Sequence, residues 1–195
     1  MLFAAIGQTT YADTFQGSIW SLTYSGSPLP DADTTHETYE ITLGVDTSGY
    51  TGGGSFLDQI ALKVSNSLSG ASLVAAPGGI ASWTLVPGGI NASGCSGSGG
   101  GFECADSVIL GNTAVGGIYS WVFDLTMDNG ALFTGLNQAS VKGRFVDALG
   151  NKIGDLVSEN ITLTSPVPEP EIYAMMGVGL ALMGWVGRRR KQHAG

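Results

Sequence analysis

Short segments in which apolar and polar residues alternate, separated by turns, run through most of this 195-residue chain. Alternation with a period of two is typical of β-strands, because successive side chains of a strand point to opposite faces of a sheet. The chain also contains 31 glycines, which are costly inside helices and common in turns. Nine strands are expected, at 18–24, 38–45, 60–65, 71–75, 83–86, 107–110, 120–126, 140–146 and 156–163.

These strands predict an all-β fold over residues 13–164, an antiparallel β-sandwich of jelly-roll or immunoglobulin-like type. Two phrases, 76–80 and 86–90, each place Pro-Gly-Gly-Ile after an apolar residue. Because Pro and Gly favour tight turns, both phrases are expected to be successive hairpin turns. Three tryptophans, Trp20, Trp83 and Trp121, lie within strand patterns and are expected to fill the core.

The chain has two cysteines, Cys95 and Cys104, on either side of a glycine-rich segment. An even number of closely spaced cysteines predicts one disulfide in an oxidising compartment. A metal site is disfavoured because two thiols lack a second pair of ligands. The disulfide would close a loop of roughly ten residues and stabilise the fold by about 2.5–3 kcal/mol.

Residues 1–12 are expected to be the remnant of a signal peptide. Met1 to Ile6 is apolar, and the small residues Thr10 and Ala12 stand three and one positions before a possible cut at Asp13, as a signal peptidase requires. The alternative is a short hydrophobic first strand.

The segment 172–187 contains no charged residue. As a helix it would be about 24 Å long, somewhat shorter than the roughly 30 Å hydrocarbon core of a membrane. Tyr173 and Trp185 lie near its ends, where interfacial aromatic residues are common. A stop-transfer cluster of four cations follows directly: Arg188, Arg189, Arg190 and Lys191. The segment therefore predicts one transmembrane helix, with a cytoplasmic tail at 188–195 and the body on the other side.

A proline-rich linker, 165–171, joins the body to this helix. Its prolines favour an extended chain, which suits a stiff spacer or a protease recognition segment. The order of Val167, Pro168, Glu169 and Pro170, a short hydrophobic helix and an arginine-rich end resembles the PEP-CTERM sorting signal of Gram-negative bacteria.

This resemblance implies a sorting pathway. Proteins with such tails are substrates of exosortase, an integral-membrane protease or transpeptidase, in strains that make extracellular polysaccharide. It implies that Val167 to Pro170 is the recognition motif and that the chain is processed at or near it. The body would then pass from the periplasmic side of the inner membrane to the cell surface or medium.

The net charge of the body limits the classes of molecule that it can bind. Once the four cations of the stop-transfer cluster are set aside, residues 1–187 carry four Lys and Arg against all sixteen Asp and Glu, a balance of −12. Such a chain repels phosphate backbones, so nucleic-acid binding is disfavoured.

Candidate catalytic groups in the body are sparse. His36 is its one histidine and is expected at the surface beside a strand, because neither a metal-ligand set nor a nucleophile elbow accompanies it. Two acidic pairs, Asp31 with Asp33 and Asp124 with Asp128, are expected in solvated loops.

We therefore expect a non-enzymatic exported protein without cofactor or metal, in a setting of matrix or polysaccharide. Two alternatives stay open. A carbohydrate-binding module would show a row of exposed aromatic side chains, and a secreted hydrolase would show two carboxyl groups close together in a cleft.

Overall fold

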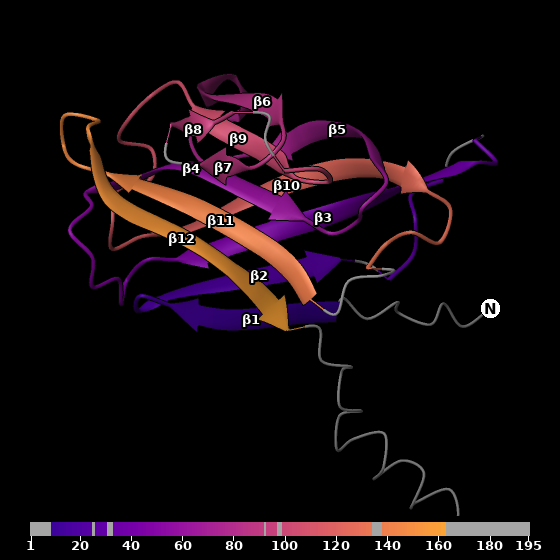
Figure 1. Cartoon of the computed structure of the whole chain (residues 1–195), viewed down its shortest axis with the longest axis horizontal. Helices are drawn as coiled ribbons and strands as arrows, with labels where there is room; N and C mark the ends of the chain where they lie inside the picture. Colours follow the sequence, from indigo (N-terminus) through magenta and orange to yellow (C-terminus); the bar gives the residue numbers. More distant parts are fainter. Residues whose placement is uncertain are drawn as a thin grey trace, which may run out of the picture. The chain divides into compact units, whose positions relative to one another are not determined.

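A computed structural model describes residues 9–24, 26–30, 33–91, 93–96, 99–133 and 138–162. They form two five-stranded sheets, in which every neighbouring pair of strands is antiparallel (Figure 1). The strand order is β1-β2-β3-β10-β5 in the first sheet and β12-β11-β4-β9-β6 in the second. The expected all-β antiparallel sandwich is confirmed.

The first sheet consists of β1 (Thr9–Phe15), β2 (Ser18–Tyr24), β3 (His36–Asp46), β5 (Leu68–Ala75) and β10 (Ile118–Asp128). The second consists of β4 (Phe56–Lys63), β6 (Trp83–Pro87), β9 (Glu103–Ser107), β11 (Gln138–Val146) and β12 (Lys152–Thr162). A small hairpin of β7 (Ile90–Asn91) and β8 (Gly94–Cys95) lies near β9 (Figure 1). A short 3-10 helix, η1 (Ile80–Ser82), precedes β6.

The main core lies between the sheets and follows from the alternation in the sequence. In β10, every second residue is buried: Trp121, Phe123, Leu125 and Met127. Strands β3 and β4 supply further buried aliphatic side chains. Each large apolar side chain that is fully buried stabilises the fold by roughly 1.5–3 kcal/mol, so this strip of side chains holds the two sheets together.

The three body tryptophans all lie in this core, as expected. Trp20 and Trp121 are fully buried, and Trp83 is 6% exposed. The Nε1 of Trp20 donates to Ser18 Oγ at 2.8 Å, and the Nε1 of Trp83 donates to the Pro77 carbonyl at 2.8 Å. Trp83 also meets Trp121 edge-on, with ring centroids 5.2 Å apart, a favourable geometry for aromatic pairs.

The prediction of a strand at 107–110 is wrong, because the strand in this region begins and ends several residues earlier. Strand β9 instead covers Glu103–Ser107, because Ala105 pairs with Ile60 of β4 on one side and with Leu85 of β6 on the other. Beyond it the backbone N–H of Val108 donates to the Ser82 carbonyl at 2.9 Å. The apolar side chains at 108–110 are 45–59% exposed, so the chain leaves the sheet where the sequence continues to be apolar.

The two Pro-Gly-Gly phrases are turns, but the expectation that they close hairpins is wrong. The first joins β5 of the first sheet to β6 of the second, and the second leads from β6 into the β7–β8 hairpin. Gly78 and Gly79 both have positive φ angles, 74° and 91°, which other residues rarely adopt. The phrases therefore encode sharp bends, whereas pairing between distant strands decides which strands they connect.

Strand β1 crosses the predicted signal-peptidase cut after Ala12. Its backbone pairs with β2 over its whole length, with Ala12 opposite Ser21 and Asp13 opposite Trp20. A cut there would remove four of the seven residues of the strand. The signal-peptide interpretation stays a prediction. If the chain were cut after Ala12, the first sheet of the mature protein would have a shortened edge strand.

No helix in the described ranges is long and apolar enough to cross a membrane. The predicted span at 172–187 and the stop-transfer cluster fall outside those ranges.

Candidate functional site

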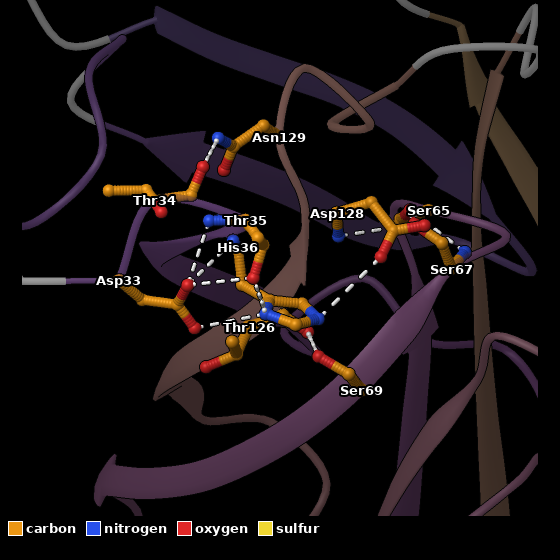
Figure 2. A network of polar contacts seen from close by, with 10 residues as sticks. All are labelled: Asp33, Thr34, Thr35, His36, Ser65, Ser67, Ser69, Thr126, Asp128 and Asn129. Atoms are coloured by element: carbon orange, nitrogen blue, oxygen red, sulfur yellow. Dashed lines mark hydrogen bonds and ion pairs between the residues drawn. The ribbon is translucent and has the colours of Figure 1, made fainter.

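His36 begins strand β3 and lies in a network of polar contacts near the end of β10 (Figure 2). Its Nδ1 lies 3.0 Å from Asp33 Oδ2, and its Nε2 lies 3.7 Å from Asp128 Oδ1. Hydrogen bonds from the backbone and side chain of Thr35, and then from His36, hold the pKa of Asp33 well below its ordinary value. The network therefore fastens the loop before β3 to the end of β10.

The neighbouring serines do not complete a catalytic triad with this histidine. Ser67 Oγ accepts from the Asp128 backbone N–H at 3.4 Å, and Ser69 Oγ donates to the Thr126 carbonyl at 3.2 Å. Figure 2 shows the His36 ring between Asp33 and Asp128, with no contact drawn from the ring to a serine. The expectation of a surface histidine beside a strand is confirmed by its position and by a side chain that is 35% exposed.

The predicted acidic pairs are not brought together in a cleft by the described residues. Asp33 and Asp128 both face His36, and Asp31 lies outside the described ranges. Asp124 and Asp128 belong to the same strand and are roughly 13 Å apart along it. The expected solvated loop is therefore wrong for Asp124, whose Oδ1 is buried. In the described part of the chain, no group of three His, Cys, Asp or Glu side chains is arranged to hold a metal ion.

A disulfide joins Cys95 of β8 to Cys104 of β9, with Cα atoms 5.9 Å apart, as predicted. It pulls the β7–β8 hairpin onto the outer face of the second sheet. There Ile90, Cys104 and Ala61 form a second, smaller buried cluster, against which Val86 and Phe102 pack. The disulfide therefore stabilises a covered face of the sheet as well as a loop.

Basic side chains gather on the same outer face. Lys63 and Lys142 lie 5.9 and 4.7 Å from the ring centroid of Phe102. Lys142 Nζ also donates to the Ile90 carbonyl at 3.4 Å, and Arg144 pairs with the buried Asp58. Three of the four cations of the body are thus engaged on this face, away from the space between the sheets.

A pocket of about 440 Å³ opens between β5 of the first sheet and strands β6 and β9 of the second. Its apolar lining includes Leu68, Ala71, Leu85, Pro87 and Phe102, and the backbone of 99–101 forms one wall. Its one carboxylate is Glu103, the first residue of β9. Pockets of this volume are typical of sites for small molecules.

Glu103 points into this space because of its register. It lies opposite Leu62 of β4, a residue of the main core, so both side chains occupy the inner face of the second sheet. Glu103 is only 5% exposed, and burial raises the pKa of its carboxyl group. Sequence reasoning missed this residue. The one signal was its spacing of two from Ala105, which places both on one face.

The predicted sorting motif, Val167 to Pro170, and the stop-transfer cluster lie outside the described residues, so their placement stays a prediction. A comparison with family models gives a finding for this part of the chain: residues 166–191 match the PEP-CTERM protein-sorting motif. The match includes the linker prolines, the uncharged segment and the four cations.

No curated protein matches the chain. Among solved structures, an uncharacterized protein from Nocardia farcinica described as having an immunoglobulin-like fold is similar to it, with 15% identity and a TM-score of 0.42. That likeness covers 83% of this chain and 91% of the other. The match at 166–191 confirms the expected resemblance of the tail: this segment of the chain is similar to the PEP-CTERM protein-sorting motif.

Proposed function

We propose that this chain is an exported, non-enzymatic surface or matrix protein that an exosortase-type membrane protease processes at or near Val167 to Pro170. The match of residues 166–191 to the PEP-CTERM protein-sorting motif carries the proposal. Before processing, the segment 172–187 anchors the chain in the inner membrane, and the four cations after it stop its transfer. After processing, the β-sandwich reaches the surface or medium.

The chemistry of the body supports export. The Cys95–Cys104 disulfide is of the kind that persists in the periplasm and outside the cell. The excess of carboxylates over cations keeps a secreted domain soluble. Several of these carboxylates accept backbone hydrogen bonds in loops; Asp147, for example, accepts from the Leu149 and Asn151 N–H groups.

The exposed hydrophobic side chains of the described residues favour this proposal over a carbohydrate-binding module. The large ones among them are all aliphatic: Ile19, Val74, Ile80, Val108, Ile109, Leu110, Ile118, Leu149 and Ile153. Stacking on sugar rings uses exposed aromatic faces, whereas the body tryptophans lie in the core. A secreted hydrolase is disfavoured because the described pocket lining offers one carboxylate, Glu103, whereas glycoside hydrolysis uses a pair.

Replacing Pro168, Glu169 and Pro170 with alanine tests the sorting proposal in a host that makes exosortase. We expect the variant to stay at full mass in the membrane fraction, while the parent chain loses its tail. A matched control, Thr164→Ala with Ser165→Ala, changes the adjacent residues and should be processed normally. Unchanged processing of the motif variant would overturn the proposal.

The stop-transfer role is tested separately. Replacing Arg188, Arg189 and Arg190 with lysine keeps the positive charge and should preserve sorting. Replacing these three and Lys191 with glutamine removes the charge, and we expect this variant to be inserted wrongly or to pass through the membrane. Equal sorting of both variants would contradict an electrostatic role for the cluster.

A further inference from the structure

Among the described residues, two acidic residues are buried as a whole, Asp58 and Glu103, and their surroundings differ. Asp58 is 6% exposed and is paired with the guanidinium of Arg144 on the outer face of the second sheet. Glu103 is 5% exposed, yet within the described residues no hydrogen-bond donor or cation contacts its carboxylate. A largely buried carboxylate without a partner loses part of its hydration, and the Glu103 oxygens are not among the described polar atoms that are fully enclosed without a partner. They can therefore be reached by a complementary group in the pocket.

Lys63 and Lys142 do not supply that group. Lys63 and Lys142 lie near the ring of Phe102 on the outer face, whereas Glu103 points inward beside Leu62. Burial is accordingly the one cause that raises the pKa of Glu103, with no cation to oppose it. The carboxylate is available to a group that enters from the pocket.

The walls of the pocket define the rest of a matching ligand. Leu68 and Ala71 of β5 and Leu85 and Pro87 of β6 line the space, so a ligand meets aliphatic side chains from both sheets. Besides Glu103, the rest of the lining is glycine backbone at Gly70, Gly88 and 99–101, together with Ser69 and Phe102. Such walls favour an unbranched apolar stem.

The glycine wall is held in place by close packing. Gly101 has a φ angle of 79°, and a Cβ atom there would lie 2.4 Å from the Ser65 carbonyl oxygen. A side chain at this position would therefore push the wall away from the segment that follows β4 and change the pocket. At Gly100 a Cβ atom would meet nothing within 4 Å, which makes the pair a useful contrast.

We propose that this pocket binds a primary ammonium group carried on an aliphatic stem, with the ammonium at the Glu103 carboxylate and the stem between Leu68 and Leu85. An anionic ligand would be repelled by Glu103 and by the acidic body, whereas a cation is attracted to both. A neutral polyol would leave its hydroxyl groups against aliphatic walls. The ammonium is either that of a small free amine or that of a lysine side chain in a polypeptide.

Calorimetric titration of the purified full-length chain with n-butylammonium, 1-butanol and butyrate at pH 7 tests the proposal, because the three probes differ mainly in charge. We expect n-butylammonium to bind at least tenfold more tightly than 1-butanol, and butyrate not to bind. Glu103→Gln should reduce n-butylammonium binding at least tenfold. The control Glu40→Gln removes an exposed carboxylate of β3 and should leave binding unchanged.

A second measurement follows the carboxyl group directly. In a ¹³C NMR titration of pH, n-butylammonium should lower the pKa of the Glu103 carboxyl group, and 1-butanol should not. Gly101→Ala should weaken n-butylammonium binding, while Gly100→Ala should not. Putrescine and Nα-acetyl-lysine methylamide then distinguish the sources: preference for the former indicates a free amine, and preference for the latter indicates a lysine side chain.

Several results would overturn the inference. They are equal binding of n-butylammonium and 1-butanol, undiminished binding by Glu103→Gln, preferential binding of a neutral sugar such as glucose, and the absence of binding by any of the amines. Each leaves the sorting proposal intact, because that proposal rests on residues 166–191.

Discussion

The indole ring of Trp20 packs against the backbone of Gly143 in the opposite sheet. A Cβ atom at Gly143 would lie 2.3 Å from Cη2 and 2.8 Å from Cζ2 of that ring. Trp20 is fully buried and its Nε1 is bonded to Ser18, so it has no free direction in which to move. The absence of a side chain at Gly143 thus sets how closely β2 and β11 approach each other.

Gly143→Ala should therefore destabilise the sandwich by about 1–3 kcal/mol, since overpacking a filled core forces side chains from their preferred rotamers. Gly70→Ala is a matched control in β5, because its Cβ atom would meet Thr126 Cβ at 3.6 Å, an ordinary contact. We expect the control to be neutral or stabilising by less than about 1 kcal/mol. Urea unfolding of both variants measures the difference, and equal stability would contradict the packing described.

The buried pair of Asp58 and Arg144 should show strong coupling in a double-mutant cycle. Arg144 Nε donates to Asp58 Oδ1 at 3.1 Å, and Nη2 pairs with Oδ2. The side chains are 7% and 15% exposed, so removing one partner leaves a mostly desolvated charge. We expect Arg144→Met or Asp58→Leu alone to cost about 2–4 kcal/mol and the double variant to cost much less than the sum. Additive losses would show that the two charges act independently.

Removing the disulfide should lower the free energy of unfolding by about 2.5–3 kcal/mol on a chain-entropy model. Cys95→Ala with Cys104→Ala keeps the small apolar character of the buried cluster at Ile90 and Ala61, whereas serine would bury a hydroxyl group there. Unfolding of the parent chain with and without a reductant provides the matched comparison. If neither change lowers stability, the β7–β8 hairpin is held by packing alone.

Glu103 should make the free energy of unfolding depend on pH. Burial raises the pKa of its carboxyl group above the ordinary value of 4.5, so the folded chain binds this proton more tightly than the unfolded chain does. Its contribution to the free energy of unfolding therefore falls as pH rises from about 4.5 through the raised pKa. Glu103→Gln should be more stable than the parent chain at pH 7 and lose that advantage near pH 4.

Asp147→Asn serves as a control of opposite sign. Hydrogen bonds from the side chain and then the backbone of Asn151 lower the pKa of Asp147 below 3.8. The stability that Asp147 contributes is present above its ordinary pKa and is lost as pH falls through the lowered one. The Asn variant should therefore be destabilised mainly above pH 4, and thermal unfolding between pH 2 and 8 separates the two residues. The same pH profile for both variants would contradict the assigned environments.

Much of the fold could be predicted because strand signals are local. Alternation located the segments around Trp20, Trp121 and Val141, and close spacing was enough to pair Cys95 with Cys104. The apolar run at 108–110 misled the prediction, because apolar residues are buried only where other strands come to cover them. The Pro-Gly-Gly phrases show the same limit, since a bend does not determine which sheet the next strand joins.

The two proposed functional features differ in how far they can be predicted from the sequence. A sorting signal is recognised as a contiguous segment, so its motif and flanking charges can be read from 166–191 alone. The Glu103 pocket is assembled from β5, β6 and β9, which the sequence separates and the sheets bring together. No local pattern distinguishes Glu103 from a solvated strand residue until its partners are known.

The intact mass of the mature protein, isolated from a host with and without exosortase, tests the central claim most directly. With exosortase present, we predict a chain that ends at or near Val167 to Pro170 and lacks the uncharged segment and the four cations. Without exosortase, the tail should remain and the chain should stay in the membrane fraction. A surface or secreted protein that keeps Arg188 to Lys191 in the presence of exosortase would contradict the account.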